Sequence, residues 1–188
     1  SESWSTAINK KSPFSGLYNG AFAALDLKQV DKAIAMCDQF RQAFPDDSLL
    51  VDAQYVEAEC RLQKKEYPQA EAIYADLIKR HSDRSDVDAW KVRRGLCRYL
   101  QKDYAGVVEL LQPEVAQLQQ PATQAEAAYW VGASQFALGQ FEPAKASLQA
   151  SLAADRSWAR ADETLLCLDD SLDTLSRNRP EPVCCRDL

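Results

Sequence analysis

The chain has 188 residues, of which 46% are hydrophobic and 27% charged, a composition typical of folded proteins that excludes wholesale disorder. Its 22 basic and 28 acidic residues give a net charge of −6 at pH 7, which argues against nucleic-acid binding because such surfaces are usually basic. No apolar run approaches the roughly 18–20 residues that span a bilayer, so we expect no membrane insertion.

Helices are predicted throughout, because Ala, Leu, Gln, Glu and Lys dominate the chain and β-hairpin signals are missing. A helix over residues 49–64 and a second helix over residues 67–80 form the clearest pair. Ser48 and Ser85 are suited to starting the next first helix, since serine favours helix N-termini. The elements therefore alternate as helix, turn, helix.

The later elements carry two further signals. Asp103 is placed to cap a helix, and Pro113 falls inside the expected span of that helix. Because proline removes a helical hydrogen bond, we expect a kink or an early stop near Gln112. A last helix is predicted over residues 157–176, and the next turn follows at Asn178.

Three anchor positions recur four times at an interval of 37 residues. The bulky anchors are Val30, Tyr67, Tyr104 and Phe141. Three residues after them come Ala33, Ala70, Val107 and Ala144, and nine residues before them come Ala21, Ala58, Gly95 and Gly132. A small residue facing the Ala of the second helix lets the two helices approach closely, and the bulky residue then fills the hinge. Such a period indicates stacked repeats.

The period also sets the predicted organisation. Residues 1–13 form an N-terminal flank, for which the tail of a preceding helix is one interpretation. Residues 14–156 form four repeats, and residues 157–188 form a fifth, truncated repeat or a capping helix. We expect the parent protein to continue beyond at least one end.

The anchors resemble those of the tetratricopeptide repeat, most closely at residues 129–132 (Tyr-Trp-Val-Gly) and 139–144 (Gly-Gln-Phe-Glu-Pro-Ala). The resemblance covers residues 14–177. It implies an all-α solenoid of stacked antiparallel helix pairs, wound as a right-handed superhelix, that acts as a protein–protein interaction scaffold. The usual repeat has about 34 residues. The longer period is similar to repeats of bacterial envelope proteins, the Tol-associated repeat protein and the outer-membrane assembly lipoprotein, which suggests a periplasmic or envelope location.

In this family the first helices line a concave surface that holds partner peptides. Mapped by position, the residues implied for that surface are Tyr18, Phe22, Tyr55, Glu59, Val92, Leu96, Tyr99, Tyr129 and Phe136. Aromatic rings suit a peptide groove because they give a large contact area at a low entropic cost. The alternative is that each ring packs against a neighbouring helix. Arg94 and Arg98 supply a contact for an acidic partner or a peptide carboxylate.

Charged residues break the family pattern in repeats two and three. Glu57 and Arg61, then Arg94 and Arg98, stand where a Leu and an aromatic residue are usual. One interpretation is a ladder of ion pairs between stacked first helices, with Glu57 against Arg94. The other is an anion-binding patch, because further basic residues crowd the same segment of repeat three.

The sequence offers no catalytic motif, so we expect neither an enzyme nor a cofactor or metal site. The single histidine, His81, falls at a helix end, where a basic side chain suits the helix dipole. Cys60 and Cys97 are one repeat apart, a spacing of about 10 Å between packed helices, whereas a disulfide needs Cα atoms within about 7 Å. We predict small buried thiols there. Cys184-Cys185 is a candidate reactive pair.

Two other functions remain open at this point. One is a structural spacer that self-associates, for example as a homodimer through its terminal helices. The other is a docking segment of a larger protein. Cysteines without a plausible pairing fit a reducing compartment better, so the cytoplasm is the alternative location.

Overall fold

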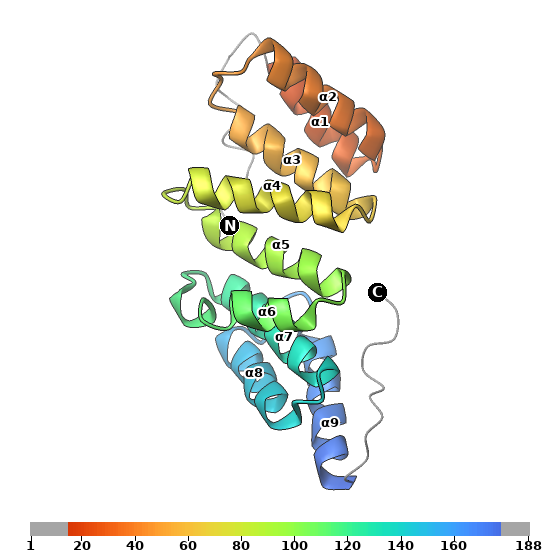
Figure 1. Cartoon of the computed structure of the whole chain (residues 1–188), viewed down its shortest axis with the longest axis vertical. Coiled ribbons are helices and arrows are strands. Elements are labelled where there is room, and N and C mark those ends of the chain that lie inside the picture. The colour runs from red at the N-terminus through yellow and green to blue at the C-terminus, as the bar shows by residue number, and fades with distance from the viewer. Residues whose placement is uncertain (1–14, 178–188) are drawn as a thin grey trace. The chain divides into compact units, whose positions relative to one another are not determined.

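The structure is a computed structural model, and it describes residues 15–177 (Figure 1). Within that range the regular elements are helices, packed sequentially in adjacent pairs. The chain divides into two compact units, an N-terminal unit up to Arg80 and a C-terminal unit from His81 onward. The predicted flank over residues 1–13 and the turn predicted at Asn178 lie outside the described residues.

The N-terminal unit contains two helix pairs. Its helices are α1 (Ser15–Asp26), α2 (Val30–Ala43), α3 (Leu50–Gln63) and α4 (Tyr67–Arg80). Each helix packs against the next, and α1 also contacts α3. Phe40 and Val56 are fully buried in its core, beside Tyr18 and Cys37. The second pair matches the prediction closely, because α3 differs from it by one residue at each end and α4 has the predicted bounds.

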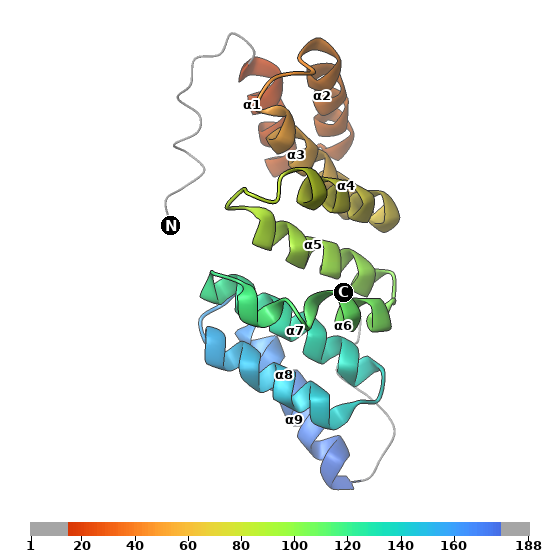
Figure 2. The ribbon, with the colours of Figure 1, turned by 60° about the vertical axis from the view of Figure 1, so that its left-hand side comes forward.

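The C-terminal unit is built around one central helix. Its elements are α5 (Val87–Leu100), α6 (Tyr104–Leu111), a short 3₁₀ turn η2 (Val115–Gln117), α7 (Pro121–Ala137), α8 (Phe141–Ala154) and α9 (Ala161–Arg177). Helix α7 contacts all the others, and every residue from Ala127 to Phe136 is buried. A helix that is apolar on all sides belongs in a core. Figure 2 shows α7 beside α6 and α8.

The 37-residue interval marks the turns inside the repeats. The bulky anchors Val30, Tyr67, Tyr104 and Phe141 are the first residues of α2, α4, α6 and α8. Their role at the hinge is confirmed where rings meet: Tyr104 lies 5.4 Å from Tyr99, and Phe141 lies 5.4 Å from Phe136, between ring centroids.

The same interval holds a feature that the sequence pattern does not reveal. Two residues after the ends of α1, α3, α5 and α7 comes a residue with a positive φ: Lys28 (56°), Lys65 (62°), Lys102 (62°) and Gly139 (73°). After Lys65, the Glu66 N–H donates to the Arg61 carbonyl at 2.9 Å, which closes the helix as a Schellman turn. Glycine is the usual residue there, because other L-residues adopt this conformation at a cost.

Small anchors allow close helix contacts, as predicted, but their principal neighbours differ. A Cβ placed on Gly132 would lie 2.8 Å from Leu148 Cγ and 3.2 Å from the Ala144 carbonyl oxygen. A Cβ placed on Gly95 would lie 2.3 Å from Leu111 Cδ1, and its three nearest atoms all belong to Leu111. The expectation of an Ala or Val partner is thus met only in part. A leucine, one turn further along the second helix, fills most of the space.

Helix ends test the remaining local predictions. The cap is confirmed, since Asp103 Oδ1 accepts a hydrogen bond from the Gly106 N–H at 3.0 Å. Helix α6 ends at Leu111, which confirms the early stop before Pro113. The serine caps are wrong. The cap residue of α3 is Leu49, and no side chain caps that helix; Asp47 Oδ1 accepts the Leu49 N–H at 2.8 Å in the turn before it.

The same correction applies to α5 and α9. The cap residue of α5 is Asp86, one residue after Ser85, and no side chain caps that helix. Helix α9 begins at Ala161, not at the predicted Ser157. Asp155 Oδ1 accepts hydrogen bonds from the backbone N–H and the hydroxyl of Ser157, at 2.8 and 2.7 Å, and these bonds hold residue 157 in the preceding turn.

Candidate functional site

The predicted partner-binding residues all lie on first helices. Tyr18 and Phe22 come from α1, Tyr55 and Glu59 from α3, Val92, Leu96, Tyr99, Arg94 and Arg98 from α5, and Tyr129 and Phe136 from α7. They are divided between the two units.

Most of the predicted groove is core. Six of its members expose no more than 9% of their surface: Tyr18, Val92, Leu96, Tyr99, Tyr129 and Phe136. For these residues the alternative interpretation, packing against neighbouring helices, describes the structure. Phe22, Tyr55, Glu59, Arg94 and Arg98 remain partly exposed.

An aromatic chain explains why the rings of the C-terminal unit are buried. Tyr99 lies 4.9 Å from Trp130, Trp130 lies 4.9 Å from Tyr129, and Tyr129 lies 5.3 Å from Trp158, between ring centroids. The guanidinium of Arg160 sits 5.3 Å above the ring of Trp130, at a distance that suits a cation–π contact. Tyr99 and Tyr129 therefore connect α5, α7 and the turn before α9. Removing both would open the core, so this pair cannot report on binding alone.

Two aromatic residues of the N-terminal unit stay accessible. Phe22 packs edge-on against Tyr18, with ring centroids 5.0 Å apart, and Tyr55 packs against Tyr74 at 6.3 Å. The hydroxyl of Tyr74 donates to Glu59 Oε1 at 2.5 Å, which fixes that carboxylate. Helices α1 and α3 are in contact. We call the partly exposed Phe22, Tyr55 and Glu59 the α1–α3 face.

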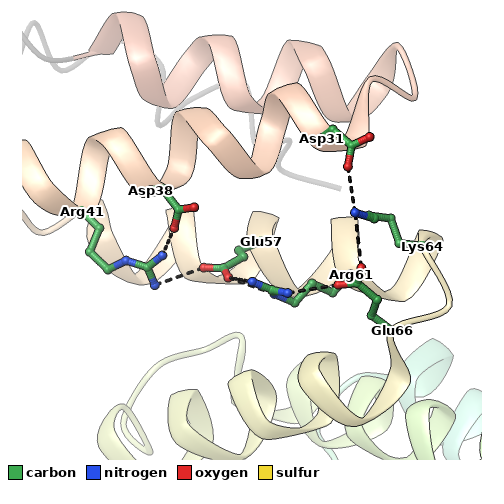
Figure 3. A network of polar contacts seen from close by, with 7 residues as sticks. All are labelled: Asp31, Asp38, Arg41, Glu57, Arg61, Lys64 and Glu66. Carbon is green, nitrogen blue, oxygen red and sulfur yellow. Dashed lines mark hydrogen bonds and ion pairs between the residues drawn. The ribbon is translucent and has the colours of Figure 1, made fainter.

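A buried carboxylate organises the charges of the same unit. Glu57 is only 4% exposed, and its carboxylate lies between two arginines: Arg41 Nη1 at 3.2 Å and Arg61 Nη2 at 2.7 Å. Figure 3 shows the full network, which runs through Asp38, Arg41, Glu57, Arg61, Glu66, Lys64 and Asp31.

This network binds elements of one unit together. It joins α2 to α3 and reaches Glu66, just before α4. The hydrogen bond to Glu57 raises the pKa of Arg61 above its ordinary value. Buried charges need such partners, because desolvation is otherwise costly. The predicted pair of Glu57 with Arg94 would join the two units and stays a prediction.

The basic segment of α5 is largely neutralised within its own unit. Lys91 Nζ lies 2.7 Å from Glu114 Oε2, and Arg93 Nη1 lies 3.8 Å from Glu126 Oε1. Arg98 Nη1 lies 3.7 Å from Asp103 Oδ2. An anion that binds here would have to compete with these carboxylates, which weakens the interpretation of the segment as an anion-binding patch.

The thiols of the N-terminal unit are buried, and their burial disfavours the reactive thiolate form. Cys37 and Cys60 are free and buried, and burial raises their pKa to about 12 and about 11. Cys60 is therefore not bonded to Cys97, as predicted. Among residues 15–177 no three His, Cys, Asp or Glu side chains gather as metal ligands, and no helix in that range is long and apolar enough to cross a membrane.

Comparison with known proteins places the fold in a family. The tetratricopeptide repeat model matches residues 16–47, 52–84 and 126–154, which together make up half of the chain. These segments coincide with the pairs α1–α2, α3–α4 and α7–α8. Helices α5 and α6, which form the third repeat, lie outside the match. A search of curated proteins found no match. The chain belongs to the tetratricopeptide repeat family, whose repeats mediate protein–protein interactions.

Proposed function

We propose that the chain is a scaffold that holds a segment of a partner protein against its first helices, with the α1–α3 face as the contact in the N-terminal unit. The observation that carries this proposal is the partial exposure of Phe22 and Tyr55 on two first helices that touch. Of the nine predicted groove residues, these are the aromatic ones that remain accessible.

The chemistry of the α1–α3 face indicates the kind of segment it would hold. Partly exposed rings contribute most when an apolar side chain covers them and removes them from water. Glu59 is a partly exposed carboxylate, and a carboxylate accepts hydrogen bonds from a basic side chain or an N–H donor. A segment with an apolar residue beside a basic residue or a backbone N–H would cover the rings and also donate to the Glu59 carboxylate. On α5, Arg94 and Arg98 remain proposed contacts for an acidic group.

The test is affinity capture followed by mass spectrometry, with the wild-type chain and the variant Phe22→Ala/Tyr55→Ala as bait. We expect the variant to lose the captured partner and to keep its helical content, since both rings are partly exposed. Gln39→Ala/Gln69→Ala is the matched control, because these two residues are exposed on the second helices α2 and α4. Equal capture by all three baits would contradict the proposal.

The 37-residue period supports one further proposal, that the chain belongs with repeat proteins of the bacterial envelope. Fractionation of the source cells with an antibody against the chain tests it. Recovery from the periplasm or the envelope is the expected result. Recovery from the cytoplasm alone would contradict it.

A further inference from the structure

Helix α9 carries the main exposed apolar surface of the described chain. Leu165, Leu166 and Leu172 are 48%, 61% and 39% exposed, and they are three of the five large hydrophobic side chains exposed among residues 15–177. Their spacing places them on one side of the helix, with Asp162 and Asp169 between them. We call these five residues the outer face of α9.

The opposite side of α9 is already used. Thr164 and Cys167 are buried, and α9 packs against α8. Both ribbon views show α9 beside α8 at the end of the C-terminal unit (Figures 1 and 2). The outer face is therefore a second apolar stripe, directed away from the core that the helix completes. Scattered exposed leucines are ordinary, whereas exposed apolar side chains gathered on one face are a feature of interaction surfaces.

The equivalent position of the preceding repeat indicates that the outer face of α9 cannot hold a helix packed as closely as α8 on α7. One repeat earlier, Gly132 lets α8 approach α7 so closely that an added Cβ would lie 2.8 Å from Leu148. The equivalent residue of α9 is Asp169, which lies 37 residues further on and is exposed. A helix packed in the manner of α8 would collide with its carboxylate. Any occupant must leave room for Asp169 and neutralise its charge.

Charge then decides between occupants. Helix α9 has five acidic residues and one basic residue, a net charge of −4. Within the described residues neither Asp162 nor Asp169 forms an ion pair. A second copy of the chain would bring acidic faces together, and like charges under an interface are costly. A helix with lysines or arginines beside its apolar stripe would instead pair with both carboxylates.

We propose that the outer face of α9 binds a basic amphipathic helix of a partner protein. The apolar stripe of that helix covers Leu165, Leu166 and Leu172, and its lysine or arginine side chains pair with Asp162 and Asp169. This is helix-in-groove recognition, in which apolar anchors recur at helical spacing. The surface is separate from the α1–α3 face, so either site can fail its test without affecting the other.

The experiment is a fluorescence anisotropy titration of the whole chain with a labelled leucine–lysine peptide of about 18 residues, long enough to form a helix. A matched peptide carries glutamate in place of lysine. The variants are Leu166→Ser and Asp169→Lys. Their controls are Leu138→Ser, which changes a leucine 42% exposed at the end of α7, and Asp83→Lys, which changes an exposed turn residue of the same unit. Circular dichroism verifies folding, and light scattering gives the mass.

We expect the lysine peptide to bind the wild type and the glutamate peptide not to bind. Leu166→Ser should weaken binding about tenfold or more, the effect of losing one buried leucine. Asp169→Lys should abolish it and confer affinity for the glutamate peptide. Both controls should bind as the wild type does.

Three results would overturn the proposal. The first is an absence of binding, and the second is equal binding by all variants, which indicates non-specific attraction of a basic peptide to an acidic protein. The third is a dimer that Leu166→Ser dissociates, which would assign the face to a second copy.

Discussion

Replacing Gly132 with alanine should destabilise the C-terminal unit, although alanine is the better helix former. In an exposed helix, Gly→Ala gains up to about 1 kcal/mol. At residue 132 the new Cβ would meet Leu148 Cγ at 2.8 Å and Leu148 Cδ2 at 2.9 Å, and Leu148 is completely buried. It would also lie 3.2 Å from the Ala144 carbonyl oxygen, which moves only with the backbone of α8.

The magnitude follows from these opposed effects. Overpacking a core costs about 1–3 kcal/mol, and a clash with both a buried side chain and backbone belongs at the upper end of that range. After the gain in helix propensity, Gly132→Ala should lower the free energy of unfolding by about 1–2 kcal/mol. Gly132→Leu should cost more, because its side chain has no space to enter.

Urea denaturation followed by far-UV circular dichroism measures the effect. Leu148→Ala alone should cost about 2–5 kcal/mol because it leaves a cavity. The double variant Gly132→Ala/Leu148→Ala should cost less than the sum by about 0.5–3 kcal/mol, since the smaller side chain removes the clash. Gly16→Ala is the control, as a Cβ there meets nothing within 4 Å. A Gly132→Ala protein as stable as the wild type, or additive effects of the two substitutions, would show that a Cβ at residue 132 does not clash with Leu148.

Three other predictions concern stability. Lys65→Gly should raise the free energy of unfolding by about 1 kcal/mol, because glycine adopts the positive φ of 62° without strain; urea midpoints measure this. Glu57→Gln should lower the free energy of unfolding by about 1–2 kcal/mol, since the guanidiniums of Arg41 and Arg61 lose their shared charge partner but stay partly hydrated. The Cys37 thiol has its pKa raised from 9.0 to about 12, so its contribution to stability is complete below pH 9 and is lost as the pH rises toward 12. Urea titrations at increasing pH should show that the free energy of unfolding of Cys37→Ala falls less steeply than that of the wild type.

The sequence predicts the repeat well because the repeat is a local property. Residues such as Tyr67 and Tyr104 stand at each hinge, and their interval alone marks where each second helix begins. The early end of α6 follows from one proline. These features depend on residues close together in the chain, which a single sequence displays.

The site is harder to predict because burial depends on distant residues. Tyr99 and Tyr129 occupy positions typical of a groove, yet Trp130 and Trp158 lie against their rings. The spacing of residues in the sequence does not predict these ring contacts. Phe22 and Tyr55 remain accessible in equally typical positions. Periodicity identifies the helix of each residue, whereas the neighbours that cover it emerge only from the packed structure.

Helix ends show the same limit on a smaller scale. Serine and aspartate are both good caps, yet neither Ser48 nor Asp47 caps α3, whose cap residue is Leu49; Asp47 accepts the Leu49 N–H in the turn before the helix. The sequence does not indicate the positive φ of Lys28, Lys65 and Lys102, because lysine is not a residue expected in that conformation. These three lysines and Gly139 are related only by their spacing of 37 residues, which places them at the same position of successive repeats.

Binding of a partner protein by the first helices of this chain, as proposed above, can be tested by site-specific photo-crosslinking. A benzoylphenylalanine replaces Phe22 or Tyr55 on the α1–α3 face, or Gln39 or Gln69 on the second helices as controls. We expect the first two positions to form a crosslink to one partner in the source cells and the control positions to form none. Crosslinks from Gln39 and Gln69, with none from Phe22 and Tyr55, would contradict the proposal.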